Sequence, residues 1–183
     1  MKSMFSLRNF LFIIVTLTSL FLINDSTSII RRMYPLRYEE IVMKNAEKYD
    51  LDPHLIFALI KAESSFKPEA RSKRGAKGLM QIMDKTACWA VDHMEIDDFD
   101  VLDLYDPQIN IAIGSWYLSW LNEQFGSNTD MMLAAYNAGN GNVMEWVSSA
   151  KELDIQSIPY KETRVFVNRV KEFHYVYEKL YEN

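Results

Sequence analysis

Glu63 is the residue of this sequence that is best placed for acid–base chemistry. Asp52-Pro53 predicts the start of a helix, because an aspartate cap precedes a proline at the first helical position. Glu63 continues the buried face of that helix, which is formed by Leu55, Ile56, Leu59 and Ile60. A half-buried carboxyl group near a helix C-terminus has a raised pKa, so it stays protonated near neutral pH. A glycosidase acid needs that protonated state.

Taken alone, Glu63 is better explained as a structural carboxylate that bonds a buried partner. Its neighbouring motifs change that balance. Glu63-Ser64 is followed by Gly78-Leu79-Met80-Gln81, and then by Ala135-Tyr136-Asn137-Ala138-Gly139. In this order the motifs resemble the soluble lytic transglycosylase family, and the resemblance runs from about Tyr38 to about Leu180. Shorter matches lie between and after them, at Asp106-Pro107, Asn110-Ile111, Gly114, Pro159-Tyr160 and Glu162-Thr163-Arg164.

The resemblance implies an all-α, lysozyme-like domain of the goose-type lysozyme and lytic transglycosylase kind. It also implies a substrate, the glycan strands of peptidoglycan, and no metal or organic cofactor. Glu63 would protonate the oxygen between N-acetylmuramic acid and N-acetylglucosamine, and would then accept the proton of the muramic acid C6 hydroxyl. The product would be a 1,6-anhydromuramoyl end. One carboxylate suffices because the acetamido group of the substrate stabilises the cation, unlike the usual pair of carboxylates.

The resemblance also implies substrate-binding residues. Ser72 would bond near the acetamido group, and Gln81 and Tyr136 would hold polar groups of the sugar. Other cleft residues would be Ser64, Met80, Met83 and Asn137. Several have structural alternatives. Ser64 could equally complete the helix end, and either methionine could fill the core. Asn137 is better explained by shaping its loop or by hydrogen bonds within the domain. Tyr136 continues an apolar stripe, so its hydroxyl would need a partner.

One position departs from the family pattern. Just after Glu162-Thr163-Arg164, where the family usually has a tyrosine, this sequence has Phe166. Activity could therefore be lower, or Tyr160 or Tyr136 could compensate. Two alternative functions follow. One is a hydrolytic muramidase on the same fold, which would need a second carboxylate such as Asp84 or Glu162 to activate water. The other is a catalytically weak wall-binding module.

The elements that must position these residues are expected to be helices, because no alternating run long enough for a sheet occurs. One helix is expected from about Tyr38 to Tyr49. Another should begin at Asp106-Pro107 and end near Gly126, with one buried face. That face would hold Ile109, Ala112, Ile113, Trp116, Tyr117, Trp120 and Leu121. A last helix buries Phe166, Val170, Phe173, Tyr177 and Leu180. Gly139 and Gly141 are expected at positive φ in a turn.

Composition excludes several classes of protein. A net charge of −5 argues against nucleic-acid binding, which needs a basic face. The single cysteine, Cys88, excludes an intramolecular disulfide and a cysteine zinc site, and it is expected to be a small core residue on a helix. The three histidines, at 54, 93 and 174, have no metal-ligand spacing. The acidic stretch 95–106 lacks the central glycine and terminal glutamate of an EF-hand, so it is expected to be a solvated loop.

The N-terminal residues indicate export. Two basic residues precede an apolar run from Phe10 to Ile23, which is shorter than the roughly 20 residues of a membrane span. We expect a signal peptide or, slightly favoured, a signal anchor over 1–28, a linker over 29–36 and the catalytic domain over 37–183. The domain would then act at the outer face of the cytoplasmic membrane or in the cell wall or periplasm. It would contact the membrane if the segment stays uncleaved, and it could serve a partner in an envelope machinery.

Overall fold

The computed structural model describes residues 12–16, 28–126, 128–149 and 155–181, and it divides the chain into two units, Met1–Pro35 and Leu36–Asn183. In the first unit, residues 12–16 and 28–33 are helical. No helix among the described residues is both long enough and apolar enough to cross a membrane. Most of the predicted export segment lies outside the described residues, so the division into signal, linker and catalytic domain remains a prediction.

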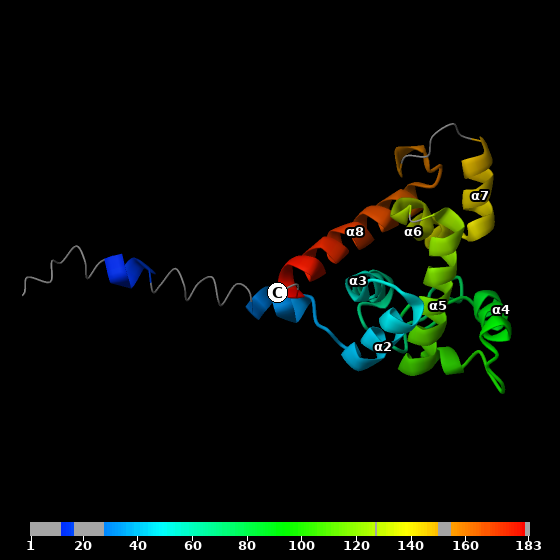
Figure 1. Ribbon diagram of the computed structural model, residues 1–183, viewed down its shortest axis with the longest axis horizontal. Coiled ribbons are helices and arrows are strands. Elements are labelled where there is room, and N and C mark those ends of the chain that lie inside the picture. Colours follow the sequence, from blue (N-terminus) through cyan, green and yellow to red (C-terminus); the bar gives the residue numbers. More distant parts are fainter. Residues whose placement is uncertain (1–11, 17–27, 127, 150–154, 182–183) are drawn as a thin grey trace, which may run out of the picture. The chain divides into compact units, whose positions relative to one another are not determined.

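The second unit is helical, as predicted (Figure 1). In the described residues of this unit the extended pairing is limited to isolated bridges, Arg71 with Lys77 and Lys77 with Ile82. The elements are α2 (Glu39–Tyr49), α3 (Pro53–Ser64), α4 (Asp84–Met94), the 3-10 turn η1 (Asp103–Tyr105), α5 (Pro107–Phe125), α6 (Thr129–Ala138), α7 (Asn140–Ser149), the 3-10 turn η2 (Ile155–Ser157) and α8 (Lys161–Tyr181).

The predicted helix boundaries are confirmed where a capping residue sets them. The Asp52 side chain accepts a hydrogen bond from the backbone N–H of His54 at the start of α3. The Asp106 side chain accepts from Gln108 and Ile109 at the start of α5. Gly126 ends α5 with φ 57°, a left-handed conformation that glycine adopts without strain.

The core lies between α3 and α8 on one side and around α5 on the other. α3 packs along α8, and α5 packs against α2, α4 and α6 (Figure 1). The predicted single buried face of α5 is only partly right. Ile113 and Leu121 are buried, but the other predicted residues are half-buried. The helix also buries residues on other sides, including Asn110, Ile111, Gly114 and Leu118, because it is surrounded by several elements.

Two further sequence predictions are wrong. Cys88 lies on helix α4 as expected, but its side chain is exposed and not in the core. Its neighbours Ala87 and Ala90 take the buried face of α4 instead. Gly139 has φ 91° at the end of α6, whereas Gly141 lies inside α7 and has no positive φ. The two glycines therefore mark a sharp junction between two helices and not a longer turn.

Candidate active site

Glu63 lies in the last turn of α3, in the wall of a cleft with two connected parts. Cavities of about 560 and 580 Å³ share five lining residues, namely Glu63, Ser72, Gln81, Asn137 and Glu162. Volumes of this size suit a small-molecule or oligomer site. In the described part of the chain the Glu63 carboxyl group forms neither a hydrogen bond nor an ion pair with another residue. It is therefore available to a ligand that enters the cleft.

Burial controls the charge of Glu63. Removal from water raises the pKa of its carboxyl group from 4.5 to about 7, and the positive charge of Arg169 on α8 partly offsets that rise. A substantial fraction of Glu63 is therefore protonated at neutral pH. The prediction that its surroundings keep this carboxyl group protonated agrees with this effect. The arrangement can donate a proton to a bound ligand and can later accept one.

Five of the predicted binding residues line the first part of the cleft together with Glu63. They are Ser72, Gln81, Met83, Tyr136 and Asn137. The other two predicted residues do not line it. The Met80 side chain is fully buried and packs on Gly114, so it belongs to the core. Ser64 is buried, and its hydroxyl donates to the Ile60 carbonyl, which is the helix-end alternative.

The loop between α3 and α4 carries three of these five predicted residues, Ser72, Gln81 and Met83, and is held rigid by its own hydrogen bonds. The Gln81 side-chain amide donates to the carbonyls of Ala70 and Gly78, at 3.1 and 2.9 Å. Gln81 itself has φ 50°, an uncommon conformation for a residue with a side chain. Ser72 Oγ accepts from the backbone N–H of Ala76 at 2.9 Å, so its own proton remains available for donation.

Asn110 on α5 fastens this loop to the core. Its side-chain oxygen accepts from the Met80 N–H at 2.7 Å, and its amide donates to the carbonyls of Lys77 and Leu104 at 3.0 and 2.8 Å. Gly78 is required at this contact. A Cβ atom there would lie 2.1 Å from the Leu104 carbonyl oxygen, and φ is 75°. The loop that lines the cleft is thus an extension of the core.

Tyr136 and Asn137 reach the cleft from the end of α6, and each has a partner. The Tyr136 hydroxyl donates to the Met80 carbonyl at 2.8 Å, which is the partner that a buried tyrosine hydroxyl needs. Burial, and then the charges of Glu63 and Tyr117, raise the pKa of Tyr136 well above its ordinary value. Asn137 Oδ1 accepts from the Thr163 hydroxyl at 3.0 Å, which ties α6 to α8. Its predicted role in shaping the domain is compatible with this bond.

Replacement of Tyr136 by phenylalanine tests how far this hydrogen bond holds the site. We expect the variant to lose about 1–3 kcal/mol of unfolding free energy, because the Met80 carbonyl is left without its donor in a buried position. Urea denaturation measures the change. Phenylalanine in place of Tyr105, a half-buried tyrosine outside the cleft, is the matched control. An unchanged midpoint for the Tyr136 variant would contradict a structural role for the bond.

Several residues of the cleft were not predicted from the sequence. Lys73 and Arg74 line its first part from the loop, and Arg74 lies 3.8 Å from Glu162 of α8, both side chains being well exposed. Two basic residues directly before Gly75 were a signal that could have been used. Tyr117, assigned to a buried face of α5, also lines the cleft, and burial raises its pKa to about 12.

Aromatic residues continue from the cleft along α4 and α5. A cavity of about 260 Å³ is lined by Thr86 and Tyr117, which also line the first part of the cleft, and by Lys85, Trp89, Trp120 and Asn140. The ring of Trp89 lies 4.9 Å from that of Trp120. Side chains of this kind offer flat apolar surface with polar edges. The cleft therefore has an aromatic extension beside it.

Four residues bear on the alternative functions: Phe166, Tyr160, Asp84 and Glu162. Phe166 is buried in the second part of the cleft, and the Arg169 guanidinium lies 5.8 Å from its ring. Tyr160 is half exposed, packs edge-on against Trp146 and does not line the Glu63 cleft. Tyr117 and Tyr136 both line it, and the charge of Glu63 acts on the Tyr136 hydroxyl. Asp84 forms an ion pair with Lys77 outside the cleft. Glu162 does line it.

Comparison with known proteins agrees with this geometry. Residues 40–159 match the Transglycosylase SLT domain family. A soluble lytic murein transglycosylase of Salmonella typhimurium is 38% identical over 143 residues, which are 75% of this chain and 22% of that protein. The chain thus spans about a fifth of that relative.

Solved structures give the same result. The 70-kDa soluble lytic transglycosylase of Escherichia coli superposes with a TM-score of 0.77 at 35% identity, over 81% of this chain and 25% of that one. A complex of the 70-kDa soluble lytic transglycosylase with bulgecin A gives 0.79 at 34% identity, over 84% and 26%. These similarities confirm the lysozyme-like, all-α fold expected from the sequence. The chain belongs to the transglycosylase SLT domain family.

Proposed function

We propose that this chain is a peptidoglycan lytic transglycosylase with Glu63 as its catalytic acid and base. The observation that carries the proposal is a carboxyl group with a pKa of about 7, placed in a cleft and left without a protein partner among the described residues. Family membership and the names of the relatives supply the substrate class. The glycosidic bond of a peptidoglycan strand carries no charge. The protonated Glu63 carboxyl group is also uncharged, so it needs no oppositely charged group on the substrate.

The reaction requires Glu63 twice. Its protonated carboxyl group donates to the bridging oxygen as the bond from C1 of N-acetylmuramic acid breaks. The resulting carboxylate then accepts the proton of the C6 hydroxyl, whose oxygen closes onto C1 to give the 1,6-anhydro end. Atoms balance without water, and the enzyme returns to its initial state. A pKa near the working pH suits a group that must be acid and base in turn.

The neighbouring residues can orient the strand. Ser72 has a hydroxyl proton to donate to an acetamido oxygen, and Met83 gives the cleft an exposed apolar surface. Because the Gln81 side-chain nitrogen is engaged within the loop, its oxygen is the atom that would accept from the sugar. Trp89 and Trp120 extend the surface beyond the cleft, which suits a polymeric substrate.

Mass spectrometry of digested cell wall tests the reaction type. The proposal predicts muropeptides with 1,6-anhydro ends, each lighter by one water than a reducing end. Reducing ends would instead identify a hydrolase, and Glu162→Gln would then be examined as a change in the base that activates water, because Glu162 shares the cleft. We also expect bulgecin A, found in complex with a similar structure, to slow the digestion.

The pH dependence of cleavage follows from the pKa of Glu63. The protonated form is the reactive one, so kcat/KM should fall about tenfold per pH unit above pH 7. Arg169 lowers the pKa of Glu63, so Arg169→Gln should move this limb to higher pH. Arg71→Gln, an exposed change outside the cleft, should leave the limb in place. A limb that stays in place in Arg169→Gln, or that lies near pH 4.5 in the parent protein, would argue against the assignment.

The presence of Phe166 raised the alternative of a catalytically weak wall-binding module. We test it by measuring cleavage of a wall suspension and of a denuded glycan by the parent protein and by Phe166→Tyr. We propose that Tyr136 supplies the phenol nearest to Glu63, so turnover does not depend on a tyrosine at 166. Phe166→Tyr should then change kcat only slightly. A large gain in kcat would show that the natural chain has reduced activity.

We further propose that the domain is exported and acts at the outer face of the cytoplasmic membrane, or in the wall or periplasm. The apolar run Phe10–Ile23 motivates this proposal. Attachment through an uncleaved segment would keep the enzyme near the membrane, where an envelope machinery could be its partner. Cell fractionation tests this. Recovery of the intact chain in the membrane fraction is expected, and release of most of it into the medium would argue for cleavage.

A further inference from the structure

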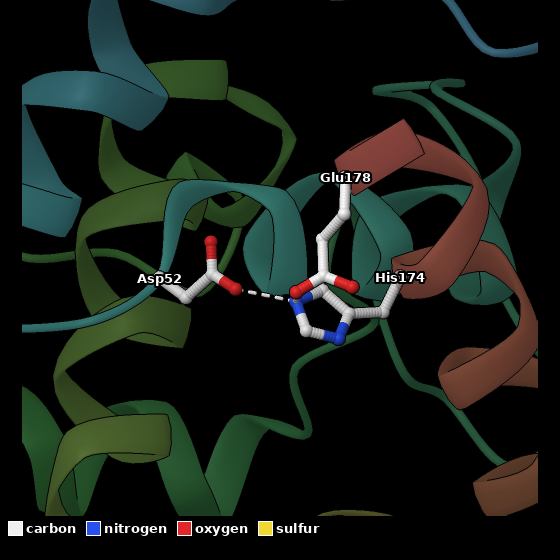
Figure 2. A group of neighbouring side chains, drawn as sticks. All are labelled: Asp52, His174 and Glu178. Carbon is white, nitrogen blue, oxygen red and sulfur yellow. Dashed lines mark hydrogen bonds and ion pairs between the residues drawn. The ribbon is translucent and has the colours of Figure 1, made fainter. Parts of the chain in front are cut away.

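A histidine and two carboxylates from distant parts of the chain meet at the far end of α3 from Glu63. Asp52 caps α3, while His174 and Glu178 lie one turn apart on α8 (Figure 2). Nε2 of His174 contacts Asp52 Oδ2 and lies 3.7 Å from Glu178 Oε1. One ligand atom from each residue can be chosen so that all lie within 4.8 Å of one another. Figure 2 shows both carboxylates beside the same ring.

These distances suit a small divalent metal ion. Zinc binds imidazole nitrogen and carboxylate oxygen at about 2.0–2.2 Å, so tetrahedral ligand atoms lie roughly 3.3 Å apart. The separation of 3.7 Å between His174 and Glu178 is already close to that value. A small opening of the His174–Asp52 contact would admit the ion. The side chains are 25–39% exposed, so solvent can reach the site and a water molecule can complete the coordination.

The Asp52 carboxylate is held in position for such a role. Its Oδ1 atom accepts from the backbone N–H of His54 at 2.8 Å, which leaves Oδ2 directed at His174. A ligand oriented by a second hydrogen bond is typical of metal sites in proteins.

We propose that Asp52, His174 and Glu178 form a binding site for a divalent transition-metal ion of the zinc class. One nitrogen and two oxygen donors suit such ions, whereas calcium and magnesium prefer oxygen donors alone. The spacing of the histidines in the sequence did not predict this site, because its ligands are 122 residues apart and only one is a histidine.

The metal would clamp the start of α3 onto α8 and would take no part in cleavage. Glu63 lies eleven positions after Asp52, which corresponds to about 16 Å along the helix. None of the three ligands lines either part of the Glu63 cleft. The expected effect is therefore on stability. It is independent of the proposed activity, so either proposal can fail alone.

Metal binding to the full chain without a histidine tag tests the site. The protein carries Cys88→Ser, because an exposed thiol could bind zinc by itself. Calorimetric titration with Zn²⁺ should show one saturable site, and Co²⁺ should give visible absorption bands of a bound ion. At about 100 times the Kd, the Tm should rise by roughly 5 °C. Glu178→Gln and His174→Ala should each weaken binding at least about tenfold.

One control variant and one deciding variant make the test conclusive. His93→Ala removes a different exposed histidine and should leave binding unchanged. Because His174→Ala also removes the contact with Asp52, Glu178→Gln carries the decision, as it preserves that contact. The proposal is overturned if no saturable binding occurs, if Glu178→Gln binds as tightly as its parent, or if His93→Ala abolishes binding. In each case the cluster is an ion pair between helices and nothing more.

Discussion

Glu63→Gln should reduce cleavage of peptidoglycan by about 10²–10⁴-fold in kcat, the usual contribution of a general acid and base. Glutamine has the size of glutamic acid, but its amide cannot donate the proton that the leaving sugar oxygen needs. The loss should appear in kcat with little change in KM, because the side chain would still fill its place in the cleft. Release of soluble muropeptides from purified wall measures it.

Glu69→Gln is the matched control for this experiment. Glu69 lies on the exposed surface of the loop after α3 and does not line the cleft. Its variant should cleave like the parent protein. Equal clearing of a wall suspension by the Glu63 variant and the parent would refute the assignment of Glu63.

Glu63→Gln should also stabilise the fold at alkaline pH. The pKa of Glu63 is higher in the folded protein (about 7) than its ordinary value of 4.5. The folded state therefore holds the proton more tightly than the unfolded state, and stability falls as pH rises from 4.5 through 7. The difference amounts to about 3 kcal/mol at most. Glu63→Gln should remove this decline, which comparison of denaturation curves at pH 4 and pH 8 would show.

Asn110→Asp should produce the largest loss of stability of the variants considered, about 3–5 kcal/mol. The two carbonyls of Lys77 and Leu104 would lose their donor and would face a carboxylate in a fully buried position. Because Asn110 fastens the loop that carries Ser72, Gln81 and Met83, kcat/KM should also fall by about tenfold or more well below the Tm.

Asn168→Asp provides the comparison, since Asn168 is exposed on α8 and its variant should stay within about 0.5 kcal/mol of the parent. Thermal unfolding measures both changes. If the two variants unfold at the same temperature, the loop is held by something other than Asn110.

Local signals in the sequence were sufficient for the helices and for the key residue. Asp52-Pro53 and Asp106-Pro107 act within one turn of chain, so their caps could be predicted. Glu63 follows the spacing of its helix and is half-buried as expected. Burial determines the pKa of Glu63, and the helical spacing of apolar residues in α3 is sufficient to predict that burial.

Features that depend on contacts between distant residues were not predictable. The spacing of α5 indicated one buried face, but the helix is enclosed by several elements. Met80 was assigned to the groove through the family motif, whereas its side chain meets Gly114 of α5 in the core. Ser64 is a local case by contrast, because its hydroxyl donates to the Ile60 carbonyl one turn earlier, which is the helix-end alternative given from the sequence. Arg169, which tunes Glu63, is far away in sequence and carried no local signal.

The protonation of Glu63 is the physical claim on which the proposed mechanism rests, and a carbon-13 NMR titration of its carboxyl group measures it directly. The resonance is assigned as the one missing from Glu63→Gln. The proposed mechanism predicts a titration midpoint near pH 7 in the free protein. A midpoint near 4.5, the ordinary value, would mean that the group is a carboxylate at neutral pH and cannot serve as the acid.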